Sequence, residues 1–128
     1  MKKLILMLAI LISGYVSSQA RLGYTYDEVR KEFWLDHEYS VGYDANLGKY
    51  IDVEFSMSDV RYYFDEDNIC YCMASVPKTK ADLHYLIELY NNTYVIVDDT
   101  HWKWYSNGVT SKIDLVVAKD GTYFFLFH

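Results

Sequence analysis

The stretch VRYYFDEDNICYCMA, residues 60–74, has the pattern of two β-strands joined by a turn. Apolar and polar residues alternate on both sides of an acidic turn at 65–68, which is typical of strands that bury one face. A second stretch, IDLVVAKDGTYFFLF at 113–127, matches it at an offset of 53 residues, with its turn at Asp120-Gly121. The two hairpins predict an antiparallel sheet, and the parity of each turn decides which face it buries.

A helix is expected before each set of strands. Thr25-Tyr26-Asp27-Glu28 is a capping box, in which the Thr25 hydroxyl accepts from the amide of Glu28 and the Glu28 carboxylate reaches back. Thr79 opens a second helical segment at an offset of 54 from Thr25. Its apolar residues recur at helical spacing: Leu83, Leu86, Ile87 and Tyr90.

The predicted fold class is α+β. Two tandem helix-plus-antiparallel-strand units, at about 22–76 and 77–128, form one antiparallel sheet with both helices packed on one face. About 108 residues remain after the N-terminal segment, which is enough for one domain with a core and too few for two.

Residues 1–20 have the features of a secretory signal peptide, because two lysines precede a short apolar run at 4–12. That run is too short to span a membrane as a helix. Cleavage after Ala20 and cleavage after Ser18 both fit. We therefore expect a secreted or periplasmic protein with a single domain at 21–128 and no membrane span.

The charge of the chain argues against one class of partner, nucleic acid. The formal net charge is −6, from 12 basic and 18 acidic residues, and no basic stripe stands out in the chain. Nucleic acid is therefore not an expected partner. With 52% hydrophobic and 18% aromatic residues, the chain has ample apolar surface to bury.

Strand parity predicts which side chains share a face, because neighbouring residues of a strand point to opposite sides. With even-length turns, the core face beneath the helices contains Val60, Tyr62, Phe64, Ile69, Tyr71, Met73, Ile113, Leu115, Val117, Phe124 and Leu126, with Trp102 and Trp104. The opposite face carries Cys70, Cys72, Ala74, Lys103, Val116 and Phe127 beside the residues predicted to bind a partner: Arg61, Tyr63, Tyr105, Tyr123 and Phe125. A three-residue turn would reverse the parity of the first hairpin, and a sheet that curls on itself would bury the aromatic face.

This aromatic face predicts a binding or interaction module, since apolar patches on soluble proteins commonly mark contact surfaces and tyrosine is enriched at interfaces. The expected partner is an envelope or extracellular protein, and a homodimer through the exposed sheet face is the second arrangement. No esterase, zinc-protease or phosphate-loop motif occurs, so no catalytic residue and no cofactor are predicted. The alternative is a small hydrolase-like enzyme that uses His101 with Asp98 or Asp99.

Cys70 and Cys72 are the two cysteines of the chain. On one strand their Cα atoms would lie about 6.6 Å apart, at the edge of disulfide geometry. A bridge and a pair of small apolar side chains are the two interpretations, and the second is favoured. No metal site is predicted, because the cysteine pair, Asp36-His37-Glu38 and Asp98-Asp99 with His101 lack a recognised ligand spacing.

The stretch LGYTYDEV at 22–29 carries a further indication. This helix opening and the order of elements resemble the β-lactamase-inhibitor-protein-like group and small exported domains related to outer-membrane assembly lipoproteins, which share a G-x-T-x-x-E-V opening. The resemblance implies a curved antiparallel sheet with helices on its convex side and a binding role for its concave side. The Gly-x-Pro that often follows the first helix is absent after Phe33-Trp34-Leu35, and the acidic hairpin of a true inhibitor has no counterpart, so neither target nor inhibition is carried over. The chain also resembles secreted proteins of gut Bacteroidetes type, which adds no chemistry.

Overall fold

The computed structural model describes residues 21–35, 37–106 and 108–128, so the predicted signal peptide lies outside the described residues. The elements are α2 (Tyr26–Phe33), β1 (Tyr39–Asp44), β2 (Gly48–Glu54), β3 (Ser58–Phe64), β4 (Cys70–Pro77), α3 (Lys80–Thr93), β5 (Val95–Asp98), β6 (His101–Ser106), β7 (Val109–Val117) and β8 (Tyr123–Phe127). Within the described ranges, neither helix has the length and apolar character needed to cross a membrane.

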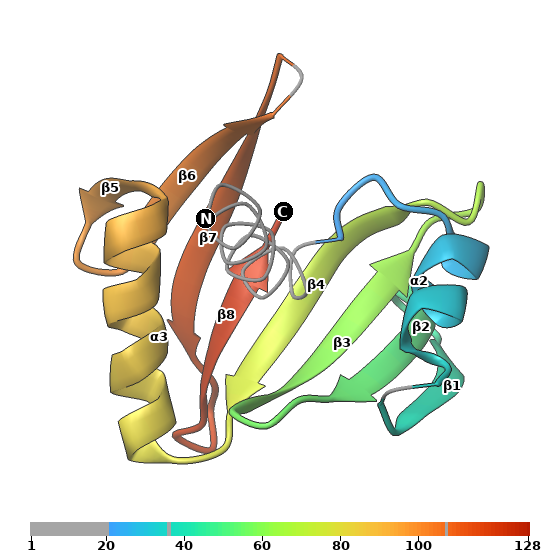
Figure 1. Ribbon diagram of the computed structural model, residues 1–128, viewed down its shortest axis with the longest axis horizontal. Helices are drawn as coiled ribbons and strands as arrows, with labels where there is room; N and C mark the ends of the chain where they lie inside the picture. The colour runs from blue at the N-terminus through green and yellow to red at the C-terminus, as the bar shows by residue number, and fades with distance from the viewer. Residues whose placement is uncertain (1–20, 36, 107) are drawn as a thin grey trace, which may run out of the picture.

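All eight strands belong to one antiparallel sheet with the order β1-β2-β3-β4-β8-β7-β6-β5. Consecutive strands are neighbours within each half, and the pairing of β4 with β8 joins the halves. In Figure 1, α2 lies beside the half that contains β1–β4, and α3 beside the half that contains β5–β8. The predicted α+β class with an antiparallel sheet is confirmed.

Helix α2 begins at the predicted capping box. Oγ1 of Thr25 accepts a hydrogen bond from the Glu28 amide at 3.1 Å, and Oε1 of Glu28 accepts one from the Thr25 amide at 3.2 Å. The helix buries Val29 and Phe33, and the ring of Phe33 stacks on that of Tyr62 with centroids 5.9 Å apart. The apolar stripe of the helix therefore packs on β3.

Helix α3 begins after Thr79, whose Oγ1 accepts a hydrogen bond from the Asp82 amide at 3.1 Å. Its predicted stripe includes Leu86 and Tyr90, and both are buried. The ring of Tyr90 lies edge-on to that of Phe125, with centroids 4.9 Å apart. The helix therefore packs on β8.

Both helices cover the same face of the sheet. Tyr62 of β3 lies opposite Met73 of β4, which in turn lies opposite Phe127 of β8. Directly opposed residues of an antiparallel pair share a face. Phe33 of α2 contacts Tyr62, and Tyr90 of α3 contacts Phe127. The core lies between this face and the helices, so the opposite face has no helix over it in the described part of the chain.

The first hairpin, β3–β4, has an odd-length turn, and the predicted even-length turn is wrong. The Asp65 amide donates to the Ile69 carbonyl at 2.9 Å across the loop 66–68, and Asn68 in that loop has a positive φ of 60°. Such a loop combines a tight turn with one left-handed residue, a conformation that asparagine tolerates. Met73 is nonetheless fully buried on the core face, as predicted.

A β-bulge at Tyr71 explains why Met73 keeps its predicted face. Cys70 pairs with Phe64 and Cys72 pairs with Tyr63, which leaves Tyr71 as an extra residue. The bulge shifts the register by one, and this offsets the one-residue shift of the odd turn. Tyr71 itself was predicted in the core and is 40% exposed, whereas Cys70 was predicted on the opposite face and is buried.

The second hairpin, β7–β8, has the same kind of loop. The Ala118 amide donates to the Thr122 carbonyl at 2.8 Å across the loop 119–121, where Gly121 has a φ of 86°. The predicted two-residue turn at Asp120-Gly121 is therefore wrong. The register then runs from Val117 opposite Tyr123 without a shift.

This register reverses the predicted faces of β8. Phe125, which lies opposite Leu115, and Phe127 belong to the core face, and both phenylalanines are 0% exposed. Phe124 and Leu126 were predicted in the core and lie on the helix-free face. Because side chains alternate with a period of two, a slip of one residue moves the whole set of β8 to the other side.

Candidate binding groove on the helix-free face

The helix-free face carries a groove of about 1090 Å³, referred to below as the groove. Ala74 of β4 lies at its centre, between Arg61 of β3 and Leu126 of β8 in direct register. The small side chain of Ala74 leaves a hollow between the larger ones on each side. Apolar side chains of β4 and β8 line this centre: Cys72, Val76, Phe124 and Leu126.

Arg61 forms one edge of this centre and is held in a fixed position. Its Nε donates to Oδ1 of Asp52 at 2.7 Å, and its Nη2 donates to Oδ2 at 2.9 Å. The guanidinium lies 3.8 Å from the ring centroid of Tyr50, a cation–π distance. The hydrogen bond to Asp52 raises the pKa of Arg61 further above its usual range. The guanidinium fork is thus already engaged by a carboxylate of the same sheet.

Three carboxylates line one side of the groove: Glu38 just before β1, Glu54 on β2 and Asp59 on β3. We call these three residues the acidic wall. Glu54 and Asp59 lie directly opposite each other, an arrangement that like charges disfavour. Nζ of Lys78 lies 2.8 Å from Oε1 of Glu54 and 3.9 Å from Oδ1 of Asp59. The hydrogen bond from Lys78 lowers the pKa of Glu54 and raises that of Lys78.

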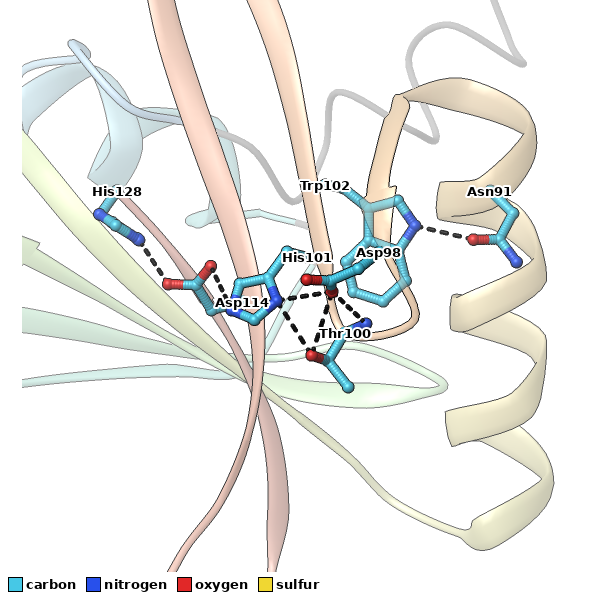
Figure 2. Close-up of polar contacts among 7 residues, drawn as sticks. All are labelled: Asn91, Asp98, Thr100, His101, Trp102, Asp114 and His128. Atoms are coloured by element: carbon cyan, nitrogen blue, oxygen red, sulfur yellow. Dashed lines mark hydrogen bonds and ion pairs between the residues drawn. The ribbon is translucent and has the colours of Figure 1, made fainter.

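The opposite wall ends in a chain of alternating histidine and aspartate side chains (Figure 2). Nε2 of His128, which lines the groove, lies 2.7 Å from Oδ2 of Asp114. Oδ1 of Asp114 lies 3.7 Å from Nε2 of His101, and Nδ1 of His101 lies 2.7 Å from Oδ1 of Asp98. The contact with Asp98 is the main cause that raises the pKa of His101.

These groups continue one row of side chains across the sheet. Asp114 lies opposite Leu126, and His101 lies opposite Asp114. The row therefore runs from the Asp52–Arg61 pair over Ala74 and Leu126 to Asp114 and His101. The centre of the helix-free face is apolar, and each side of it is closed by an aspartate with a basic partner, Arg61 on one side and His101 on the other.

The contacts of His101 do not form a catalytic triad. Oγ1 of Thr100 lies 3.0 Å from Nδ1 of His101, the same nitrogen that contacts Asp98 (Figure 2). In a triad, one imidazole nitrogen faces the nucleophile and the other faces the orienting carboxylate. Both nitrogens of His101 face carboxylates, which favours the imidazolium and an ion-pair role. Asp99, the other predicted partner of His101, is exposed in the same turn.

The structure separates the five residues predicted to bind a partner. Arg61 and Tyr63 line the groove. Tyr105 is 61% exposed on β6, where β7 separates it from β8, and it is not among the groove residues. Tyr123 is exposed at the start of β8, on the side of the core residues by register. The prediction that Phe125 is accessible is wrong, because the shifted register buries it under α3.

Sequence reasoning missed Phe124 and Leu126 as groove residues. The signal that could have found them is the glycine at 121. A glycine is typical of the last, left-handed position of a three-residue hairpin loop as well as of a two-residue turn, and Gly121 has that conformation. The pairing of Asp52 with Arg61 had no local signal, since it depends on the register between β2 and β3.

Across residues 21–35, 37–106 and 108–128, no three histidine, cysteine or carboxylate side chains converge in a way that could hold a metal ion. Comparison with known proteins found no matching family model, no matching curated protein and no matching solved structure.

Proposed function

We propose that this protein is an exported, non-enzymatic binding module that holds a segment of a partner polypeptide in the groove. The observation that carries the proposal is an apolar hollow on a helix-free sheet face, closed on both sides by polar groups. Pockets for small ligands commonly measure about 300–1,000 Å³ and bury most of the ligand. At about 1090 Å³ the groove lies near the upper end of that range, and its lining reaches from β1 across the sheet to β8, an extent that suits a polypeptide segment.

The place of action is proposed from the N-terminal segment. The apolar run at 4–12 after two lysines supports export, and an envelope or extracellular protein is then the expected partner. Of the five predicted residues, Arg61 and Tyr63 are retained in this proposal. Phe124, Leu126 and Ala74 take the place of the residues that lie elsewhere.

We further propose that the two halves of the sheet are tandem repeats. In chain order a helix precedes four antiparallel strands twice, and Arg61 and Asp114 occupy matching positions at an offset of 53. Each of these two residues forms an ion pair with the strand next to it. Superposition of β3 on β7 in an experimental structure should preserve that offset, whereas beyond the bulge at Tyr71 the matching positions shift by one residue. A best fit of β3 on β7 at another offset would contradict the repeat.

Affinity capture with matched variants tests the binding role. The wild type should retain a partner from the native envelope or culture medium, whereas Ala74→Trp, which fills the hollow, should lose it. Leu126→Ser should weaken capture without adding bulk. Tyr85→Ala, on the exposed side of α3, serves as the control. Unchanged capture by both groove variants, with thermal stability unchanged, would place any binding site elsewhere. Capture of a second copy of this chain would indicate a homodimer.

A further inference from the structure

We infer that the segment held in the groove is cationic and amphipathic, with apolar side chains over Phe124 and Leu126 and a lysine or arginine against the acidic wall. The inference rests on the proposed function and names the chemistry of the partner. It is carried by the charges that line the groove together with the apolar centre beside them.

The acidic wall contains more carboxylates than the ammonium of Lys78 can neutralise. That ammonium contacts Glu54 closely and lies 3.9 Å from Oδ1 of Asp59, so one positive charge faces two of the three carboxylates. Glu54 and Asp59 are opposed in register, so their repulsion is relieved only where a cation bridges them. A second cation, supplied by the partner, would complete this compensation.

The groove attracts anions poorly. Arg61, the arginine among the lining residues, already donates two hydrogen bonds to Asp52 and lies against Tyr50. A carboxylate or phosphate would have to displace Asp52 to reach the guanidinium fork. Lys103 and Lys112, which lie opposite each other on β6 and β7, are not among the lining residues.

The acidic wall and the apolar centre are close enough for one short polypeptide segment to contact both. Asp59 on β3 lies opposite Val76 on β4, and Phe124 lies on β8, the next strand, so the carboxylate and the phenylalanine are two strands apart. Two strand spacings are about 9.6 Å, and alternate residues of an extended chain are about 7 Å apart. A lysine or arginine side chain is long enough to cover the remaining distance, so a polypeptide with a basic residue two positions from an apolar one fits the spacing.

Binding of three labelled peptides to the purified mature chain tests the inference. The first repeats leucine-serine-lysine-serine, so that leucine and lysine alternate along one face of the extended chain. The second replaces lysine by glutamate, and the third replaces leucine by serine. The leucine–lysine peptide should bind at least about tenfold more tightly than either of the others, and added salt should weaken it. Glu54→Gln with Asp59→Asn should remove most of this preference, whereas Glu66→Gln with Glu88→Gln makes the same charge change away from the groove and should retain it.

The outcomes separate the inference from the proposed function. If the leucine–glutamate peptide binds as well as the leucine–lysine peptide and Ala74→Trp abolishes both, the groove binds polypeptide but the cationic inference is wrong. If the leucine–lysine peptide binds equally to wild type and to Ala74→Trp, the attraction is general and both fail. Absence of binding by any peptide also overturns the inference, while capture of a native partner would still support the proposed function.

Discussion

The hairpins β3–β4 and β7–β8 begin alike and bury different residues. Each has a three-residue loop with a left-handed residue at its end, Asn68 in one and Gly121 in the other. The first hairpin then contains the bulge at Tyr71, whereas the second keeps an uninterrupted register. A single extra residue, in the loop or in a bulge, therefore decides which side chains of the following strand point to the core. In the second hairpin the extra loop residue is not offset by a bulge, so Phe125 lies in the core and Phe124 lies in the groove.

Truncation of the two neighbouring phenylalanines of β8 tests this difference between the hairpins most directly. Phe125→Ala should lower the free energy of unfolding by about 3–5 kcal/mol, because a fully buried ring in contact with Tyr90 leaves a cavity. Phe124→Ala should cost about 1 kcal/mol, since its side chain is half-buried in the groove. Denaturant unfolding of both variants provides the measurement. A larger loss of unfolding free energy in Phe124→Ala than in Phe125→Ala would contradict this register and support the two-residue turn.

The left-handed residues of the two loops predict a smaller effect. Gly121→Ala should destabilise the protein by about 1 kcal/mol, because an alanine at positive φ is strained even though an added Cβ would meet no atom within 4 Å. Gly121→Asn copies the first hairpin and should cost less. Thermal melts of the two variants, compared with Asn68→Gly, give the ranking. Equal stability of the Gly121→Ala and Gly121→Asn variants would contradict the left-handed conformation assigned to residue 121.

The bulge of the first hairpin predicts a difference in thiol reactivity. Cys70 is buried and Cys72 lines the groove; both thiols are free. Burial raises the pKa of Cys70 to about 12, so its reactive thiolate is scarce. Iodoacetamide should therefore modify Cys72 first in the folded protein, and both thiols after unfolding without a reductant. Mass spectrometry of timed samples would follow this, and two unlabelled cysteines after unfolding would indicate a disulfide.

The ion pairs of Arg61 and His101 should respond differently to pH, because histidine titrates near neutral pH and arginine does not. The raised pKa of His101 means that its contact with Asp98 stabilises the fold below about pH 6.5, and that this contribution is lost as pH rises through the raised pKa. Asp98→Asn should lower the pKa of His101, whereas Asp99→Asn should change it little. NMR titration of the imidazole resonances measures both. A pKa of His101 that is the same in wild type and Asp98→Asn would contradict the assigned contact.

Local patterns were sufficient for the elements and insufficient for the register. The capping box at Thr25 and the apolar stripe of α3 are encoded within one or two turns, and both are present as predicted. The face of Phe125 depends on one residue of loop length, which alternation alone does not define. The Arg61–Asp52 pair and the chain from His128 to His101 arise from pairing between strands, so their components were visible in the sequence and their proximity was not.

The pairing of β4 with β8 also has a consequence for the order of folding. Three residue pairs make this junction, and their members are about fifty residues apart in the chain, whereas the other strand pairs join consecutive strands. Contacts of such high contact order close late, because a long loop must be ordered first. Ala74 and Leu126, the centre of the groove, are one of these pairs. The ladder hydrogen bonds of this junction fall on the flanking pairs, because the amides of the even-numbered β8 residues are bonded to β7. We expect pulse-labelled hydrogen exchange to protect the β2–β3 amides before those of Ser75 and Phe125, so a nascent or half-folded chain would have no assembled groove to offer a partner.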